Sequence, residues 1–127
     1  MIKVYLLANA LLYVLFAAWC TFAPDKTSAS LGIQAINGSG RSEILTIYGG
    51  LQAGLALLFA VFACFESLQA AGLLAAACLY VPLAIWRVAT LAFGSDIQST
   101  TYAVAALEVL LALAAVALLW GRKLPLA

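Results

Sequence analysis

Charged residues are scarce in this sequence. They make up 9% of its 127 residues, whereas a soluble domain carries about 25%. A chain with so few charges cannot cover a water-facing surface. The six Lys and Arg residues are scattered and the net charge is +1, so the sequence has neither a basic nucleic-acid-binding surface nor an acidic tail, and no nucleic-acid partner is expected.

Histidine is absent and cysteine is sparse. Without His, the chain lacks the most common general base and the most common metal ligand. The cysteines Cys20, Cys64 and Cys78 form no Cys-x-x-Cys pair and lie in apolar runs, so they are expected to be small buried hydrophobic residues. No Ser/His or Cys/His arrangement exists. We therefore expect a protein that is not an enzyme and that has no cofactor and no metal.

Hydrophobic residues, in contrast, make up 67% of the chain and gather in four long runs, at about 2–22, 44–65, 70–93 and 102–120. A helix needs about 20 residues to cross a hydrocarbon core, and it satisfies its own backbone hydrogen bonds in lipid. The sequence therefore predicts a single all-α domain over residues 1–127. We expect an integral membrane four-transmembrane-helix bundle with a longer first loop at about 23–42.

The residues between these runs predict the helix ends. Pro24 closes the first helix. Ser42 is suited to cap the second, with Glu43 next to the positive end of the helix dipole. Ser99 or Thr100 is suited to cap the fourth.

The first loop contains a short apolar run, residues 31–36, that cannot cross a bilayer. We expect it to lie at the membrane interface or over the mouth of the bundle as a lid. The alternative is an ordered connector with no further role.

The distribution of basic residues predicts the orientation. With four spans, both termini share one side, which carries Lys3, Arg122 and Lys123, against Lys26 and Arg41 on the other. Three positive charges against two favour cytoplasmic termini. The opposite side is called the outer side below.

The second run carries a motif of small residues, Gly50-x-x-x-Gly54, which overlaps Gly49-x-x-x-Ala53. Small residues four apart let another backbone approach closely. This strip is expected to pack within the bundle, and homodimerisation is the alternative. In the third run, Pro82 is expected to kink the helix.

Two ionisable residues, Arg87 and Glu108, lie within the apolar runs, where charges are costly and usually mark function. Arg87 lies seven residues before Gly94, and Glu108 lies seven after Thr101. Both are thus about 10 Å below the outer surface. Because a short loop joins these helices, they should be antiparallel neighbours, and the two side chains should form an ion pair.

The second run adds Tyr48 and Gln52 at a similar depth, with Arg41 on the same face at α-helical spacing. We expect an outward-opening pocket built from Tyr48, Gln52, Arg87 and Glu108. Its rim is expected to carry Arg41, Glu43 and Asp96. A different interpretation is that the Arg87–Glu108 pair only fixes the register of two helices.

The segment from Arg41 to Gly54, Arg-Ser-Glu-Ile-Leu-Thr-Ile-Tyr-Gly-Gly-Leu-Gln-Ala-Gly, resembles the signature of small bacterial four-helix membrane proteins of the domain of unknown function 4345 type, within the DoxX-like set. The positions that match are Tyr48, Gly49, Gly50, Arg87 and Glu108. The resemblance covers nearly the whole chain. It implies a multi-pass protein of the bacterial inner membrane and supplies no reaction.

Three functions remain open. The first is a protein that binds a lipid-like or small amphipathic ligand in an outer-leaflet pocket, with membrane lipids as partners. The second is an accessory subunit of a larger membrane complex, or a homo-oligomer, in which Arg87 and Glu108 are purely structural. The third, a small proton-coupled transporter, is disfavoured because no lone central carboxylate is present in the spans.

Overall fold

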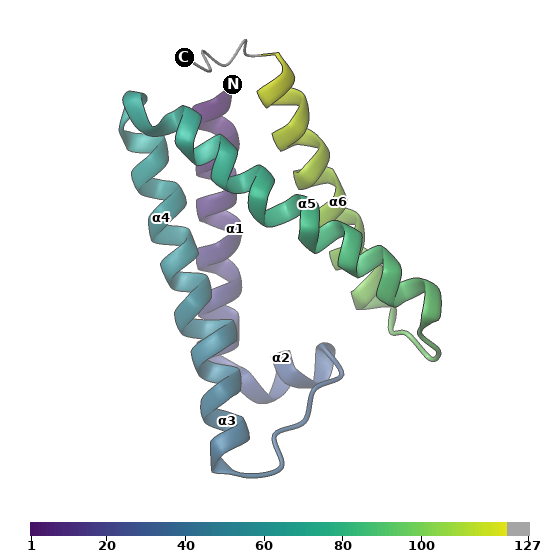
Figure 1. Ribbon diagram of the computed structural model, residues 1–127. Helices are drawn as coiled ribbons and strands as arrows, with labels where there is room; N and C mark the ends of the chain where they lie inside the picture. The colour runs from purple at the N-terminus through teal and green to yellow at the C-terminus, as the bar shows by residue number, and fades with distance from the viewer. Residues whose placement is uncertain (122–127) are drawn as a thin grey trace. The chain divides into compact units, whose positions relative to one another are not determined.

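The computed structural model describes residues 1–121, and all regular structure in that range is helical (Figure 1). Four helical segments are long and apolar enough to cross a membrane: Ile2–Phe22, Gly38–Cys64, Glu66–Phe93 and Ser99–Trp120. The predicted all-α architecture with four candidate spans is thereby confirmed. The chain divides into two compact units, one covering Lys3–Gln69 and the other starting at Ala70.

The first unit is built on two long helices that lie side by side (Figure 1). One is α1 (Ile2–Phe22). The other runs through α3 (Gly38–Ile44), the π-helical segment η1 (Leu45–Leu51) and α4 (Gln52–Cys64).

Aromatic contacts join these two helices. The ring of Tyr13 stacks on that of Phe59, with centroids 5.7 Å apart and planes 3° from parallel. Phe16 meets Tyr48 edge to face at 6.5 Å. Such pairs add about 0.5–1.5 kcal/mol beyond the area they bury, so they fix how α1 and its neighbour pack.

Glycine permits a close approach between the same helices. A Cβ atom added at Gly49 would lie 2.9 Å from Thr21 Oγ1. The expected packing role of the small-residue motif is therefore found at Gly49. At Gly50 and Gly54 no atom lies within 4 Å of an added Cβ, so the first unit leaves that part of the motif uncovered.

The second span begins earlier than predicted. Asn37, not Ser42, is its N-cap, and the Asn37 side chain accepts a hydrogen bond from the Gly40 amide at 2.9 Å. The prediction placed the start near residue 44 because the first turns are polar. A capped polar turn is as helical as an apolar one, and hydropathy does not detect it.

A short helix, α2 (Pro24–Ser30), occupies part of the expected first loop. Pro24 stands at its first turn, a position that needs no backbone N–H. The Thr27 side chain is fully buried and donates to the carbonyl oxygens of Trp19 and Ala23, at 3.2 and 2.9 Å. These bonds tie α2 to the end of α1.

A short 3₁₀ turn, η2 (Glu66–Leu68), ends the first unit. The second unit contains α5 and α6, which form a hairpin. Helix α5 covers Gln69–Phe93 and continues through Pro82 without ending. Helix α6 covers Ser99–Trp120. Its N-cap is Gln98, which makes no side-chain capping bond, so neither Ser99 nor Thr100 is the cap that was predicted.

The turn between α5 and α6 depends on two residues. A Cβ added at Gly94 would lie 2.9 Å from Ile97 Cδ1 and 3.0 Å from the Thr90 carbonyl oxygen. Asp96 takes a left-handed backbone conformation, with φ 57°, which Asp tolerates better than most residues. A larger residue at 94 would therefore require the Ile97 side chain and the Thr90 carbonyl to shift.

The expectation that all three cysteines are buried is wrong for two of them. Cys20 is buried, whereas Cys64 and Cys78 are exposed. In a membrane helix, a small apolar side chain can face lipid at little cost, so an apolar run does not separate buried from lipid-facing positions.

Candidate functional site

The polar centre of the second unit lies on the buried stripes of its two helices. On α6, the buried residues are Ala105, Glu108, Ala112 and Ala115, whose spacings of three and four define one helical face. On α5, buried Tyr80 and Ala84 lead to Arg87 at the same spacing. Both charged residues therefore continue stripes that consist otherwise mainly of small side chains.

Arg87 and Glu108 form the predicted ion pair. Arg87 Nε donates to Glu108 Oε2 at 2.8 Å, and Arg87 Nη2 donates to Glu108 Oε1 at 2.9 Å. Two parallel bonds between a guanidinium and a carboxylate are the strongest geometry for such a pair. The side chains are 31% and 12% exposed, respectively.

The pair makes an ionisable group tolerable within an apolar span. A lone Arg or Glu near the centre of a membrane helix costs several kcal/mol on most scales, about 2.5–3.5 by insertion. Pairing cancels the net charge and uses both carboxylate oxygens. Arg87 and Glu108 thus form a neutral but strongly dipolar group within an alanine-rich hairpin.

Thr90, one turn after Arg87, does not extend this polar group with its hydroxyl. Its Oγ1 donates to the Arg87 carbonyl oxygen at 2.9 Å. The hydrogen-bonding capacity of the hydroxyl is thus satisfied within α5 by the backbone of the same helix.

The other two predicted pocket residues belong to the first unit. Tyr48 contacts Phe16, and Gln52 Nε2 donates to the carbonyl oxygen of Ile47 at 3.3 Å. The structure brings Arg87 and Glu108 together within one unit. The pocket that would combine them with Tyr48 and Gln52 stays a prediction.

The π-helical segment changes one part of that prediction. Each residue of a π-helix rotates by a smaller angle about the helix axis than an α-helical residue does, because its backbone hydrogen bonds join residues five apart instead of four. Arg41 precedes η1 and Tyr48 lies within it. The α-helical spacing that placed them on one face therefore does not apply.

The three predicted rim residues have separate local roles. Arg41 forms an ion pair with Asp25, with 3.4 Å between Nη1 and Oδ1. Glu43 is exposed on α3, and Asp96 is exposed in the turn after α5. Of the basic residues used for the orientation, Arg122 and Lys123 lie outside the described residues.

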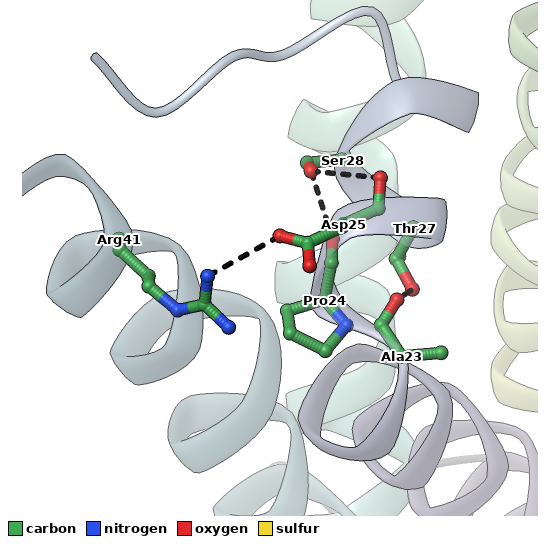
Figure 2. Close-up of polar contacts among 6 residues, drawn as sticks. All are labelled: Ala23, Pro24, Asp25, Thr27, Ser28 and Arg41. Atoms are coloured by element: carbon green, nitrogen blue, oxygen red, sulfur yellow. Dashed lines mark hydrogen bonds and ion pairs between the residues drawn. The ribbon is translucent and has the colours of Figure 1, made fainter. Parts of the chain in front are cut away.

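The Asp25–Arg41 pair was not anticipated. Figure 2 shows the Arg41 guanidinium extending from α3 toward Asp25, which follows Pro24 on α2. The sequence does carry a signal for it, since Pro at a first helical position followed by an acidic residue is typical of a helix start. With α2 present, the region expected as one long loop contains a helix, and Asp25 on that helix can reach Arg41 on α3.

Comparison with protein-family models, with curated proteins and with solved structures gave no match. The resemblance to the domain of unknown function 4345 type therefore stays a prediction.

Proposed function

We propose that this chain is a non-enzymatic, multi-pass protein of the bacterial inner membrane that binds a lipid-like or small amphipathic ligand on its outer side. The observation that carries the proposal is the bidentate Arg87–Glu108 pair on the buried stripes of an apolar hairpin. Ionisable groups inside spans are retained mainly where they serve function.

The chemistry of the pair suits an amphipathic molecule. Arg87 keeps about a third of its side chain exposed, and Glu108 holds its guanidinium through two bonds. A ligand with a small polar end can hydrogen-bond to this dipolar group. Its apolar part can then lie along the surface left by the alanines of α5 and α6.

The proposal predicts that loss of the pair reduces retention of co-purifying lipid. Glu108→Gln removes the carboxylate charge while keeping the side-chain shape. Arg87→Met with Glu108→Leu removes the polar group without leaving an unpaired charge. Native mass spectrometry of protein released from membranes should show less bound lipid for both variants.

The matched control is Glu66→Gln, which neutralises an exposed acid in the η2 turn outside the apolar helices. It should leave the bound lipid unchanged. If the two pair variants keep the wild-type lipid profile while remaining folded, the pair serves only to hold the hairpin together, and the proposed binding function is wrong.

A second function, an accessory subunit of a larger membrane complex or a homo-oligomer, is favoured by a different observation. The first unit leaves Gly50 and Gly54 uncovered, and small residues four apart are typical of helix–helix interfaces in membranes. Gentle extraction should then recover the protein in a large assembly, which Gly54→Leu should disrupt. A single small particle for the wild-type protein would contradict this alternative.

A further inference from the structure

The first unit contains a cavity of about 690 Å³ that the functions above do not use. It lies between α2, the segment 32–37 and the start of α3, and its lining includes both members of the Asp25–Arg41 pair. Cavities of about 300–1,000 Å³ are typical of small-ligand sites. All its walls come from one continuous stretch, residues 25–41.

The ion pair between Asp25 and Arg41 at this cavity is weak. A single contact of 3.4 Å joins Arg41 Nη1 to Asp25 Oδ1, and the side chains are 56% and 86% exposed. Among residues 1–121, neither side chain makes another ion pair or hydrogen bond. An exposed pair of this kind contributes about 0–1 kcal/mol. A ligand that supplies one charge of each sign can therefore replace it at little cost.

The neighbouring backbone adds donors for an anion. Residues 34–37 line the cavity, and in the described part of the chain none of their amides donates a backbone hydrogen bond outside the helices. Backbone amides and a guanidinium are the usual partners of phosphate oxygens in proteins. The carboxylate of Asp25 supplies the complementary site for an ammonium group.

The position of the cavity along the chain places it at the level of lipid headgroups. It follows directly after the end of α1 at Phe22 and precedes the apolar part of the second span. Trp19, in the last turn of α1, is of the type that anchors helix ends at the interface. The lining also includes the apolar residues Ile33 and Ile36, and Ile36 is 89% exposed.

From these observations we propose that the cavity at residues 25–41 binds an aminoalkyl phosphate, the headgroup of a phosphatidylethanolamine-type lipid or the free compound. Arg41 and the amides of residues 34–37 contact the phosphate, and Asp25 contacts the ammonium group. This second site is separate from the Arg87–Glu108 site and does not rest on the function proposed for it.

The test uses the full chain in nanodiscs that contain equal amounts of phosphatidylethanolamine and phosphatidylglycerol. The lipids that stay bound after release are counted by native mass spectrometry. The wild-type protein should enrich phosphatidylethanolamine about tenfold, the effect of one charge-assisted hydrogen bond. Asp25→Asn and Arg41→Gln should each remove the enrichment, and Asp25→Lys should reverse it in favour of the anionic lipid.

Two exposed charges on the same helices, which do not line the cavity, give the controls. Lys26→Gln on α2 and Glu43→Gln on α3 should keep the enrichment. Equal retention of the two lipids by the wild-type protein, together with no binding of O-phosphoethanolamine, would overturn the proposal. So would enrichment that survives in both Asp25→Asn and Arg41→Gln.

A soluble competitor separates the two sources of the ligand. If O-phosphoethanolamine displaces the bound lipid, the site recognises the headgroup alone. If it does not, while the enrichment still depends on Asp25 and Arg41, the ligand is the intact lipid. Repeating the measurement with the Arg87→Met and Glu108→Leu double variant keeps the two sites distinguishable, since the enrichment should remain there.

Discussion

At the residue scale, the two ion pairs of this chain differ in how much a single substitution should cost. Arg87 and Glu108 share two short bonds at a largely buried site, whereas Asp25 and Arg41 share one long, exposed contact. Removing one partner of a buried pair leaves an uncompensated charge, which is far more costly than losing an exposed pair.

Glu108→Leu should therefore lower the free energy of unfolding by about 2–3 kcal/mol, somewhat less than for a fully buried pair because Arg87 is partly exposed. Arg87→Met combined with Glu108→Leu should recover most of that loss, since no charge is left unpaired. Thermal unfolding in detergent micelles measures both variants. Asp25→Asn is the comparison and should change stability by less than about 1 kcal/mol. A double variant as unstable as the single one would refute this account.

Adjacent glycines in the second span allow an equally direct comparison. Gly49→Ala would force a methyl group to within 2.9 Å of Thr21 Oγ1, whose hydroxyl donates to the Ala17 carbonyl oxygen at 2.7 Å. It should destabilise the protein by about 1–2 kcal/mol through overpacking.

Gly50→Ala is the control for that substitution. No atom lies within 4 Å of its added Cβ, and Ala favours a helix over Gly by about 1 kcal/mol, so this variant should be neutral or slightly stabilising. Thr21→Ala should relieve the clash and restore stability to Gly49→Ala. Equal effects at positions 49 and 50 would show that the close approach to Thr21 does not matter.

At the element scale, a buried hydroxyl helps to hold α2 against the end of α1. Thr27 donates to carbonyl oxygens at the end of α1, so Thr27→Val should release α2 at a cost of about 1 kcal/mol. Hydrogen exchange should then speed up over Pro24–Ser30 and stay unchanged in the rest of the first unit. Ser30→Ala removes a similar local bond on the exposed side of α2 and should have little effect. Global loss of protection would contradict a local role.

The helical elements differ in how far the sequence could predict them. The Arg87–Glu108 pair was predictable because a short connector makes two apolar helices antiparallel, and depth along each helix then follows from counting residues. The starts of the second and fourth spans were missed because their first turns, with residues such as Ser39 and Ser99, are polar.

The π-helical segment Leu45–Leu51 could not be predicted from hydropathy, since its seven residues read as an ordinary apolar run. Gly49, where an added Cβ would lie 2.9 Å from Thr21 Oγ1, is within this segment, and such a tertiary contact is not visible in hydropathy. The Asp25–Arg41 cavity was missed for a related reason. It exists only when α2 and α3 both form, and neither helix is apolar enough to be found from composition.

At the scale of the whole molecule, the four candidate spans predict an orientation in the membrane. If all four cross the bilayer, both termini and the turn at Glu66 lie on one side, and residues 23–37 and the turn at Asp96 lie on the other. The bias of three basic residues against two predicts cytoplasmic termini under the positive-inside rule. The Asp25–Arg41 cavity is then expected at the outer leaflet.

Labelling of single cysteines tests this orientation. In a background with Cys20, Cys64 and Cys78 replaced by Ala, Ser39→Cys and Ser95→Cys should react with a membrane-impermeant maleimide added to intact cells. Ser67→Cys, in the η2 turn, should react only after the membrane is opened. Because the charge bias is a single residue, adding Lys at positions 30 and 98, neither of which is buried, should reverse it and invert the labelling pattern. Labelling of Ser67→Cys from outside in the parent background would show the reverse orientation, with the termini outside and the Asp25–Arg41 cavity facing the cytoplasm.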